Sequence, residues 1–219
     1  MNFSEAEENY IKAIWRLQNG DSSVSTNALS EELQTRPASV TDMLKRLKEK
    51  KLLHYEPYYG VKLNDEGRQL ALRIVRRHRL WEYFLSEKLK FEWDAVHEIA
   101  EELEHVSSTE LINRLDAFLG YPQTDPHGDP IPDTSGNMVV TSQMTLQQLG
   151  EQQAAIVTAV GDQSSSLLEL LRQKQIKIGT KVEVLHRYKY DGSLELKIGT
   201  RHQTTISEQL AKTIFINPF

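Results

Sequence analysis

Residues 36–63 read RPASVTDMLKRLKEKKLLHYEPYYGVKL, and this stretch decides the fold. Pro37 suits the first turn of a helix, and apolar residues recur behind it at helical spacing. A loop at residues 56–60, which contains one Pro and one Gly, then separates two short apolar runs, the usual pattern of a β-hairpin. The stretch therefore predicts a helix followed directly by a hairpin, and the core side of that helix holds Val40, Leu44 and Leu47.

Two further helices are predicted upstream of this stretch. Residues 4–18 carry apolar side chains at helical spacing, and Gly20 follows as a stop signal. Ser25 or Thr26 can cap a second, short helix, which is separated from Pro37 by only a short turn. Helix, helix, helix and hairpin in this order predict a winged helix-turn-helix domain.

Downstream, the pattern changes twice. Asn64 begins a long helix to about Lys90, and two shorter helices are expected at residues 94–105 and 107–120, the second with a capping box of Ser107 and Glu110. Four prolines between residues 121 and 142 predict a linker. The final segment holds short apolar runs that predict a small β-barrel: residues 155–160, 182–185, 194–198, 204–206 and 213–216, with a helical stretch around 167–171.

The fold class is therefore mostly α with β, in four segments. We expect a winged helix-turn-helix domain at 1–64, a second helical domain at 65–120, a Pro/Gly linker at 121–143, and a small β-barrel at 144–219.

Composition excludes several functions. The 219 residues include no cysteine, which rules out a disulfide scaffold, a thiolate zinc finger, an iron–sulfur cluster and a cysteine nucleophile. No apolar run approaches the ~20 residues of a membrane helix and no signal peptide is evident, so a cytoplasmic protein is expected. The net charge is −5, yet residues 36–79 hold twelve basic and five acidic side chains. A basic stretch in an acidic chain is typical of a phosphate-facing surface, although solvated helix faces also carry such charge.

A group of imidazoles and carboxylates indicates a metal site. On a helix, positions 97, 101, 104 and 105 fall within about 100° of arc, so their side chains converge on one side. The preceding helix adds two more donors one turn apart. The six candidate ligands are His78, Glu82, His97, Glu101, Glu104 and His105. Nitrogen and oxygen donors of this kind suit a divalent cation.

The sequence resembles the diphtheria-toxin-repressor and manganese-transport-regulator family of metal-dependent transcriptional repressors, in the long form with a carboxy-terminal FeoA-type, Src-homology-3-like domain. The resemblance covers essentially the whole chain. The matching segments are Glu8–Ile11, Arg36–Thr41, Arg77–Glu82, His97–His105 and Asp125–Pro132.

The resemblance implies a homodimer with two metal sites in each subunit. It thereby implies that 1–64 is the DNA-binding domain and that 65–120 is the helical dimerisation and metal-binding domain. One would contain His78, Glu82 and His97, and the second would contain Asn9, Glu101, Glu104 and His105. Asp162 and Gln163 are the candidates for oxygen ligands from the barrel. Two positions depart from the family, because Asn9 replaces Met or Asp and Lys12 stands where the short manganese-type members carry a ligating Glu. The binuclear cluster of those members therefore cannot simply be copied here.

The donor set decides which metals to expect. Glu101 replaces the cysteine of the iron-sensing branch, which leaves carboxylate, amide and imidazole donors without sulfur. Such a set suits hard-to-borderline ions, so the family parallel favours Mn²⁺, with Fe²⁺ next and Zn²⁺ or Co²⁺ able to bind in vitro.

The predicted partner is double-stranded DNA with a palindromic operator. Hydroxyl and basic side chains suit phosphates, Asp42 can accept a hydrogen bond from cytosine, and Ala38 can contact a thymine methyl group. The candidate DNA-binding residues are Arg36, Ala38, Ser39, Thr41, Asp42, Lys45, Arg46, Tyr58 and Tyr59. For the two wing tyrosines, ordinary hairpin packing is an equal alternative. Metal would raise DNA affinity if it stabilised the arrangement of the two recognition helices of a dimer.

Two other functions stay open. A winged-helix regulator with a merely structural acidic cluster would respond to another effector, and alanine at His78 or His105 would leave DNA binding unchanged. Less favoured is a metallo-hydrolase, because His97-Glu98-x-x-Glu101 resembles a zinc-peptidase helix. Glu98, however, is turned about 100° from His97, and the remaining donors fill the coordination that catalysis needs open. We therefore expect no catalytic residues, no enzyme activity, no small organic substrate and no membrane.

Overall fold

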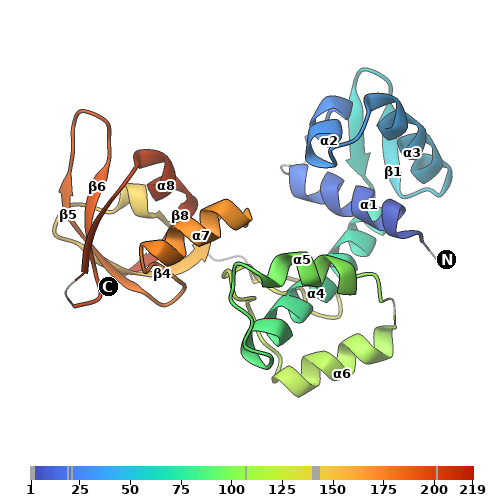
Figure 1. Ribbon diagram of the computed structural model, residues 1–219. Helices are drawn as coiled ribbons and strands as arrows, with labels where there is room; N and C mark the ends of the chain where they lie inside the picture. Colours follow the sequence, from blue (N-terminus) through green and yellow to red (C-terminus); the bar gives the residue numbers. More distant parts are fainter. Residues whose placement is uncertain (1–2, 19, 21, 107, 140–143, 201) are drawn as a thin grey trace. The chain divides into compact units, whose positions relative to one another are not determined.

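The computed structural model describes all residues except 1–2, 19, 21, 107, 140–143 and 201 (Figure 1). The described chain forms two compact units. The first contains residues 1–78, 102–114 and 132–138, and the second contains residues 79–101, 115–131 and 139–219. Three helices, α4 (Asp65–Glu87), α5 (Val96–Leu103) and α6 (Thr109–Leu119), each contribute residues to both units.

The first unit contains the predicted winged helix-turn-helix. Its elements are α1 (Glu5–Leu17), α2 (Thr26–Glu32), α3 (Pro37–Glu49), β1 (Leu53–Glu56) and β2 (Gly60–Leu63), labelled in part in Figure 1. Ser4 and Glu7 form a capping box on α1, and the Ser25 hydroxyl accepts a hydrogen bond from the Ala28 amide to cap α2. Strands β1 and β2 pair antiparallel, and Val24 adds an isolated bridge to Val61.

Helix α3 is held by its predicted apolar face. Val40, Leu44 and Leu47 are fully buried in a cluster with residues of α1 and α2, among them Ile14 and Leu29. Full burial of one such side chain stabilises the folded state by about 1.5–3 kcal/mol. The opposite face of α3 is therefore free to carry polar residues.

The following helices confirm the predicted order but not every boundary. The Gly67 amide donates to Asn64 Oδ1 at 2.9 Å, so Asn64 caps α4 as predicted. Helix α5 begins two residues later and ends two residues earlier than expected. The cap of α6 is Ser108, whose hydroxyl accepts from the Leu111 amide, and the predicted capping residue Ser107 lies outside the described residues.

The carboxy-terminal part of the second unit is a six-stranded antiparallel sheet in the order β3-β8-β4-β5-β6-β7. The strands are β3 (Met144–Thr145), β4 (Ala154–Val160), β5 (Lys181–Arg187), β6 (Leu194–Ile198), β7 (His202–Ile206) and β8 (Ile214–Pro218). Among the described residues, no pairing joins β3 to β7, so the expected barrel is not closed. In the described part of the chain, β3 has two residues and pairs with β8.

Two helices cover this sheet, α7 (Ser165–Gln173) and α8 (Glu208–Thr213) (Figure 1). Leu168 and Leu171 of α7, with Leu210 of α8, belong to the same buried cluster as the inward-facing residues of the strands. Helix α8 was not predicted, because six residues are too short for a clear helical repeat. Its cap is Ser207, which accepts from the Leu210 amide.

The predicted linker is folded over most of its described length. The carboxylate of Asp125 organises a turn through residue 129, with a bridge between Thr124 and Pro130, and Asp133 organises a second turn through Asn137. Prolines and glycines in this segment therefore shape turns rather than a flexible connection. Residues 140–143 lie outside the described part.

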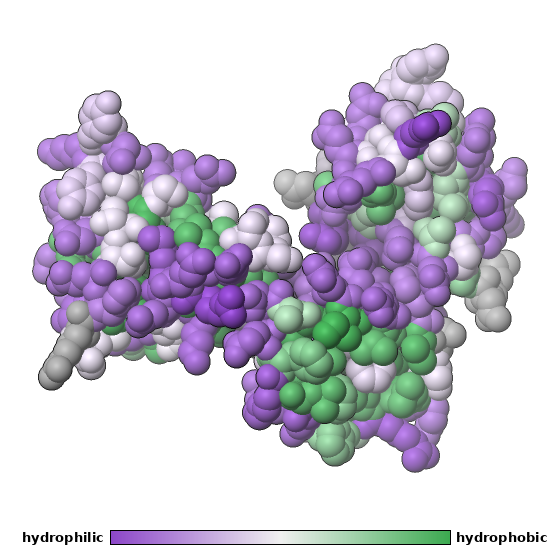
Figure 2. All heavy atoms as spheres, viewed as in Figure 1, coloured by the Kyte–Doolittle hydropathy of each residue, from purple (hydrophilic) through white to green (hydrophobic). Residues whose placement is uncertain are grey.

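Exposed apolar side chains gather on and near α6, where Figure 2 shows a green surface. Leu111 and Phe118 on α6 are exposed, and so are Leu89, Phe91 and Tyr121. An apolar patch of this kind is typical of a protein interface. Within the described residues, no helix is both long and apolar enough to cross a membrane.

Candidate metal centre

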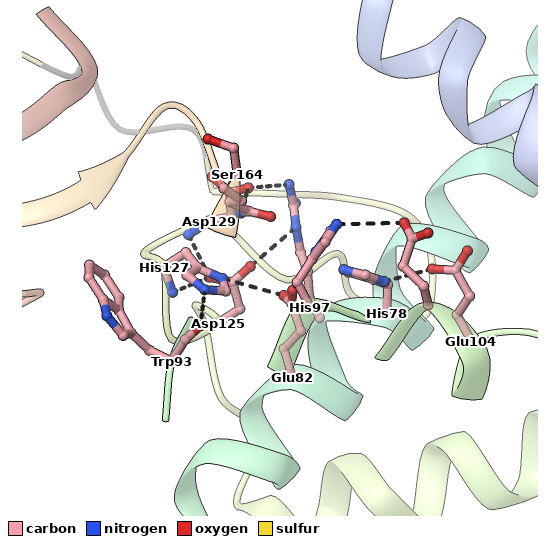
Figure 3. Close-up of polar contacts among 12 residues, drawn as sticks. His78, Glu82, Trp93, His97, Glu104, Asp125, His127, Asp129 and Ser164 are labelled. Carbon is pink, nitrogen blue, oxygen red and sulfur yellow. Dashed lines mark hydrogen bonds and ion pairs between the residues drawn. The ribbon is translucent and has the colours of Figure 1, made fainter. Parts of the chain in front are cut away.

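Glu82, Asp125 and His127 form a buried group in the second unit, which we call the acidic trio (Figure 3). Each side chain offers one ligand atom, and these atoms lie within 4.8 Å of one another. All three residues are buried, Glu82 and His127 completely. Buried carboxylates are costly unless they are paired or bind a cation, so their convergence requires an explanation.

The loop that carries Asp125 and His127 is rigidly held. Asp125 Oδ1 accepts hydrogen bonds from the backbone amides of His127 and Asp129, at 2.8 and 3.0 Å. The His127 carbonyl accepts from the Val160 amide on β4. Gly128 has φ +88°, and a Cβ built on it would lie 2.0 Å from the carbonyl oxygen of Thr158. Only glycine fits at this position. The close contact between the loop and β4 therefore fixes the positions of Asp125 and His127.

The hydrogen bond of His127 leaves one ring nitrogen facing the trio. Its Nε2–H donates to the carbonyl oxygen of Trp93 at 2.8 Å, which assigns the Nδ1 lone pair as the free acceptor. Nδ1 lies 3.7 Å from Glu82 Oε2. His127 Nδ1 and Asp125 Oδ2 are both buried without a hydrogen-bond partner among the described residues. These two atoms are therefore suited to act as metal ligands.

The charges around the trio favour a divalent cation. Three carboxylates, of Glu82, Asp125 and Asp129, face one guanidinium in the described part of the chain, that of Arg79. Arg79 donates to Asp129 at 2.9 Å and lies 3.6 Å from Asp125. With all three carboxyls ionised, two negative charges remain for a cation to neutralise.

The pKa values reflect this excess of negative charge. Burial, with the charges of Glu82 and Asp129, raises the pKa of Asp125 to about 7, although Arg79 and His127 oppose the rise. Burial lowers the pKa of His127, but its contact with Glu82 and the charge of Asp125 raise it more, so the net shift is upward. Without metal, the trio therefore tends to hold protons in place of a cation. The residues present fit a bound divalent metal.

Glu82 links the trio to two ligands that the sequence predicted. Its Oε1 accepts from His97 Nδ1–H at 3.0 Å, and His97 Nε2 lies 3.6 Å from Glu101 Oε1. Glu82 is buried, whereas His97 and Glu101 are half-buried. The second unit thus brings Glu82, His97 and Glu101 together. Glu98, the general base in the hydrolase alternative, is exposed.

The other predicted ligands are residues of the first unit. His78 lies one turn before Glu82 on α4 and donates from Nδ1 to Glu104 Oε2 at 2.7 Å. Glu104 also accepts from Lys12, and His105 donates to Glu8 at 2.9 Å. Asn9 is half-buried on α1. The predicted set of Asn9, Glu101, Glu104 and His105 is thus divided between the two units.

The barrel residues predicted as ligands contact the loop or the local turn. Gln163 donates to Asp129 Oδ2 at 3.0 Å, and Asp162 accepts from the Ser164 amide at 2.8 Å. Gln163 therefore contacts a neighbour of the trio, whereas the contacts shown for Asp162 lie within its own turn.

Asp125 and His127 were missed by sequence reasoning. The prediction of a linker at residues 121–143 left both Asp125 and His127 outside the candidate ligands, although His127 is fully buried. Its backbone joins the turn, and the imidazole faces Glu82. The sequence feature that could have identified them is the alternation of Asp125, His127 and Asp129. Side chains that commonly bind metals can share one site when they alternate along an ordered loop.

The predicted DNA-binding residues lie as expected on α3 and the wing. Six of them are exposed along α3 and its cap: Arg36, Ala38, Ser39, Asp42, Lys45 and Arg46. Thr41 is half-buried and its hydroxyl donates to the Pro37 carbonyl. Tyr58 and Tyr59 are highly exposed at the wing tip, which argues against simple hairpin packing. Thr41 and the wing tyrosines line a cleft of about 500 Å³ whose other wall carries Ser25, Thr26 and Asn27.

Comparison with known families accounts for most of the chain. Residues 2–61 match the iron dependent repressor N-terminal DNA binding domain, residues 64–133 match the iron dependent repressor metal binding and dimerisation domain, and residues 144–218 match the FeoA domain. The family ranges follow the order of segments that the sequence predicted.

Individual relatives agree with this family. The chain is 30% identical over 128 residues to the iron-dependent repressor IdeR of Mycobacterium tuberculosis, covering 58% of this chain and 56% of that protein. The chain thus spans little more than half the length of that curated relative. It is 32% identical over 117 residues to the uncharacterized HTH-type transcriptional regulator MJ0568 of Methanocaldococcus jannaschii, covering 53% of this chain and 94% of that protein.

A solved structure extends the similarity to nearly the whole chain. It is described as a manganese-dependent transcriptional repressor in complex with manganese, and it superimposes with a TM-score of 0.86 at 32% identity, covering 97% of this chain and 100% of the other. Sequence matches in three consecutive segments and this shared fold lead to one conclusion. The chain belongs to the iron-dependent repressor family.

Proposed function

We propose that the protein is a metal-dependent transcriptional repressor that binds DNA as a homodimer and controls metal-uptake genes in the cytoplasm. The observation that carries this proposal is the acidic trio. Its His127 and Asp125 each present a buried atom that has no hydrogen-bond partner within the described part of the chain. The same chain presents the exposed polar face of α3 beside an exposed wing. A cation-binding centre and a DNA-binding surface in one chain are the two parts that a metal-responsive repressor needs.

Mn²⁺ is the proposed metal, and Fe²⁺ is the next candidate. The trio offers two carboxylates and one imidazole, with His97 and Glu101 in contact with Glu82, and the chain has no cysteine to favour soft ions. Glu82, Asp125 and His127 would hold the ion, and Arg79, Asp129 and Trp93 would orient the ligands. The bound metal would neutralise the excess negative charge of the centre. Asp162 stays a predicted ligand.

The dimer would be formed through the apolar surface of α6. Leu111 and Phe118 are exposed on this helix, and large exposed apolar side chains of this kind are typical of subunit interfaces. A two-fold dimer presents two α3 helices, so the expected operator is palindromic, with half-sites spaced by one helical turn of DNA. By linkage, metal that favours the DNA-binding arrangement raises DNA affinity by about 5–150-fold.

The direct test is DNA binding by the full-length protein at fixed salt. Fluorescence anisotropy with labelled promoter DNA of metal-transport genes from the same organism would be measured with chelator, with Mn²⁺ and with anaerobic Fe²⁺. We expect metal to raise affinity, and we expect Lys45→Ala with Arg46→Ala to abolish DNA binding without changing metal affinity. Lys90→Ala is the control, because Lys90 is an exposed lysine outside α3. Equal affinity with chelator and with both metals would refute the proposal.

Metal affinity should fall as the pH decreases below 7. The pKa of Asp125 is raised to about 7 and that of His127 is also raised, so both groups take up protons that a metal must displace. Protonation of Asp125 alone lowers the apparent affinity about fivefold between pH 7 and pH 6, and His127 makes the decrease steeper. Isothermal titration with Mn²⁺ at pH 8, 7 and 6 would measure this. A constant affinity over that range would mean that the trio is not the binding site.

A further inference from the structure

A cleft of about 640 Å³ in the second unit opens beside the acidic trio, and we call it the α4 cleft. Its lining comes from three segments: the end of α4 with the loop that follows (within 83–93), the loop of the trio (124–126), and the end of α7 with the residues after it (within 172–178). Glu92 and Lys177 in this lining are exposed, so the cleft opens to solvent. Asp125 therefore belongs both to the trio and to the lining of the cleft.

The trio is almost completely buried, so a metal ion needs a passage through the protein to reach it. Glu82 and His127 have no exposed surface, whereas Asp125 is 4% exposed and lines the α4 cleft. An octahedral Mn²⁺ ion with its water ligands occupies about 200 Å³, at ~30 Å³ for each water molecule. The α4 cleft therefore has room for a hydrated ion next to a ligand of the trio.

The approach to the trio from α5 is occupied by His97. Its Nδ1–H donates to Glu82 Oε1 at 3.0 Å, and its Nε2 lies 3.6 Å from Glu101 Oε1 (Figure 3). An ion that arrives from this side has to displace an imidazole that is already hydrogen bonded to a carboxylate. At the α4 cleft, the ion meets Asp125, whose Oδ2 has no hydrogen-bond partner among the described residues. The cleft is therefore the less obstructed route.

The six-stranded sheet and its helices hold one side of the α4 cleft in place. Trp93 packs against the apolar core of this sheet, and its carbonyl oxygen accepts a hydrogen bond from His127. Arg172 at the end of α7 lies 3.5 Å from Asp94, the residue after Trp93. These contacts join both sides of the cleft, so the packing that orients His127 also sets the width of the passage.

We propose that divalent metal ions enter and leave the acidic trio through the α4 cleft, between α4 and the segment that follows α7. This inference rests on the proposed function, in which the trio is the metal centre. It gives the FeoA domain, residues 144–218, a role in the rate of metal exchange, because residues at and after the end of α7 line part of the passage.

The first test narrows the cleft of the full-length protein by Ser86→Trp. Ser86 is a half-buried residue of α4 that lines the cleft and lies outside the trio. The larger side chain should slow both association and release of Mn²⁺ by about tenfold and change the dissociation constant by less than about twofold, because a narrower passage raises the barrier without changing the end states. Stopped-flow tryptophan fluorescence measures binding of Mn²⁺ and its release into excess EDTA, since the ring centroids of Trp93 and His127 are 5.8 Å apart.

Ser166→Trp is the matched control, because Ser166 is an exposed serine of α7 outside the cleft lining. It should keep the wild-type rates. The kinetic phase of the trio is the one that His127→Ala removes. If this phase keeps its wild-type rates in Ser86→Trp, or if that variant weakens binding without slowing release, the inference is overturned and the proposed function stands. If His127→Ala removes no phase, the trio is not the metal centre and both fail.

The second test changes charges at the exposed end of the cleft and does not depend on the Ser86→Trp variant folding. At low ionic strength, Glu92→Lys should lower the association rate of Mn²⁺ about threefold, and Lys177→Glu should raise it by a similar factor. Both effects should disappear at about 0.5 M salt, where the charges are screened. Glu169→Lys is the control, because Glu169 is an exposed carboxylate of α7 outside the cleft lining. Equal association rates in all three variants would overturn the inference.

Discussion

Replacement of His127 by alanine is expected to lower the affinity for Mn²⁺ by at least about 100-fold, because it removes a buried ligand whose Nδ1 faces Glu82. Metal-activated DNA binding should be lost together with the Mn²⁺ affinity, since the acidic trio would no longer bind Mn²⁺ at the same metal concentration. Isothermal titration with Mn²⁺ and anisotropy with operator DNA measure the two effects separately.

Two further variants make this result specific. Glu82→Gln keeps the size of the side chain but removes one negative charge, and it should also reduce affinity strongly. His186→Ala is the matched control, because His186 is an exposed histidine outside the trio that contacts Glu151 and Tyr188. If His127→Ala bound Mn²⁺ as tightly as His186→Ala, the acidic trio would not be the metal centre.

Gly128→Ala is expected to have the second largest effect, although glycine provides no metal ligand. The added Cβ would lie 2.0 Å from Thr158 O and 2.6 Å from Ala159 Cα, and the backbone has φ +88°. Strain of this conformation together with the steric clash should cost about 3 kcal/mol or more. Because Asp125 and His127 lie on either side within the same loop, metal affinity should fall as well.

Gly179→Ala separates these two causes. Gly179 has φ +82°, but a Cβ there would have no atom within 4 Å. This control should therefore cost only about 1–2 kcal/mol and leave Mn²⁺ affinity unchanged. Chemical denaturation and Mn²⁺ titration of both variants measure the difference. Equal effects of the two substitutions would show that the contact between the loop and β4 does not position the ligands.

Sequence reasoning predicted the elements with strong local signals. The apolar repeat of α3, the caps of α2 and α4, and the order of three helices and a hairpin are local properties of the chain, and the structure confirms them. Errors arose where local signals are weak. Helix α8 is too short to show a repeat, so it was not predicted. The small β domain is confirmed, although its sheet does not close into a barrel among the described residues.

The candidate metal site was predicted only in part, because spacing along a helix is a local property and contacts between elements are not. His97 and Glu101 are one turn apart on α5, and His78 and Glu82 are one turn apart on α4, so helical geometry alone indicated that each pair shares a face. Which members meet across different elements could not be derived from spacing. The structure joins Glu82 to His97 and His127, whereas it joins His78 to Glu104.

The residue pattern alone was enough to establish a winged helix-turn-helix, a basic recognition surface and a supply of nitrogen and oxygen ligands. Tertiary structure alone decided how those ligands are shared. It brought Asp125 and His127 of a proline-rich loop onto Glu82, and it placed the ammonium of Lys12 on Glu104. The physical reason is that charge compensation depends on distance between groups far apart in sequence. The acidic trio was left with negative charge for a metal, whereas Glu104 accepts hydrogen bonds from Lys12 and His78.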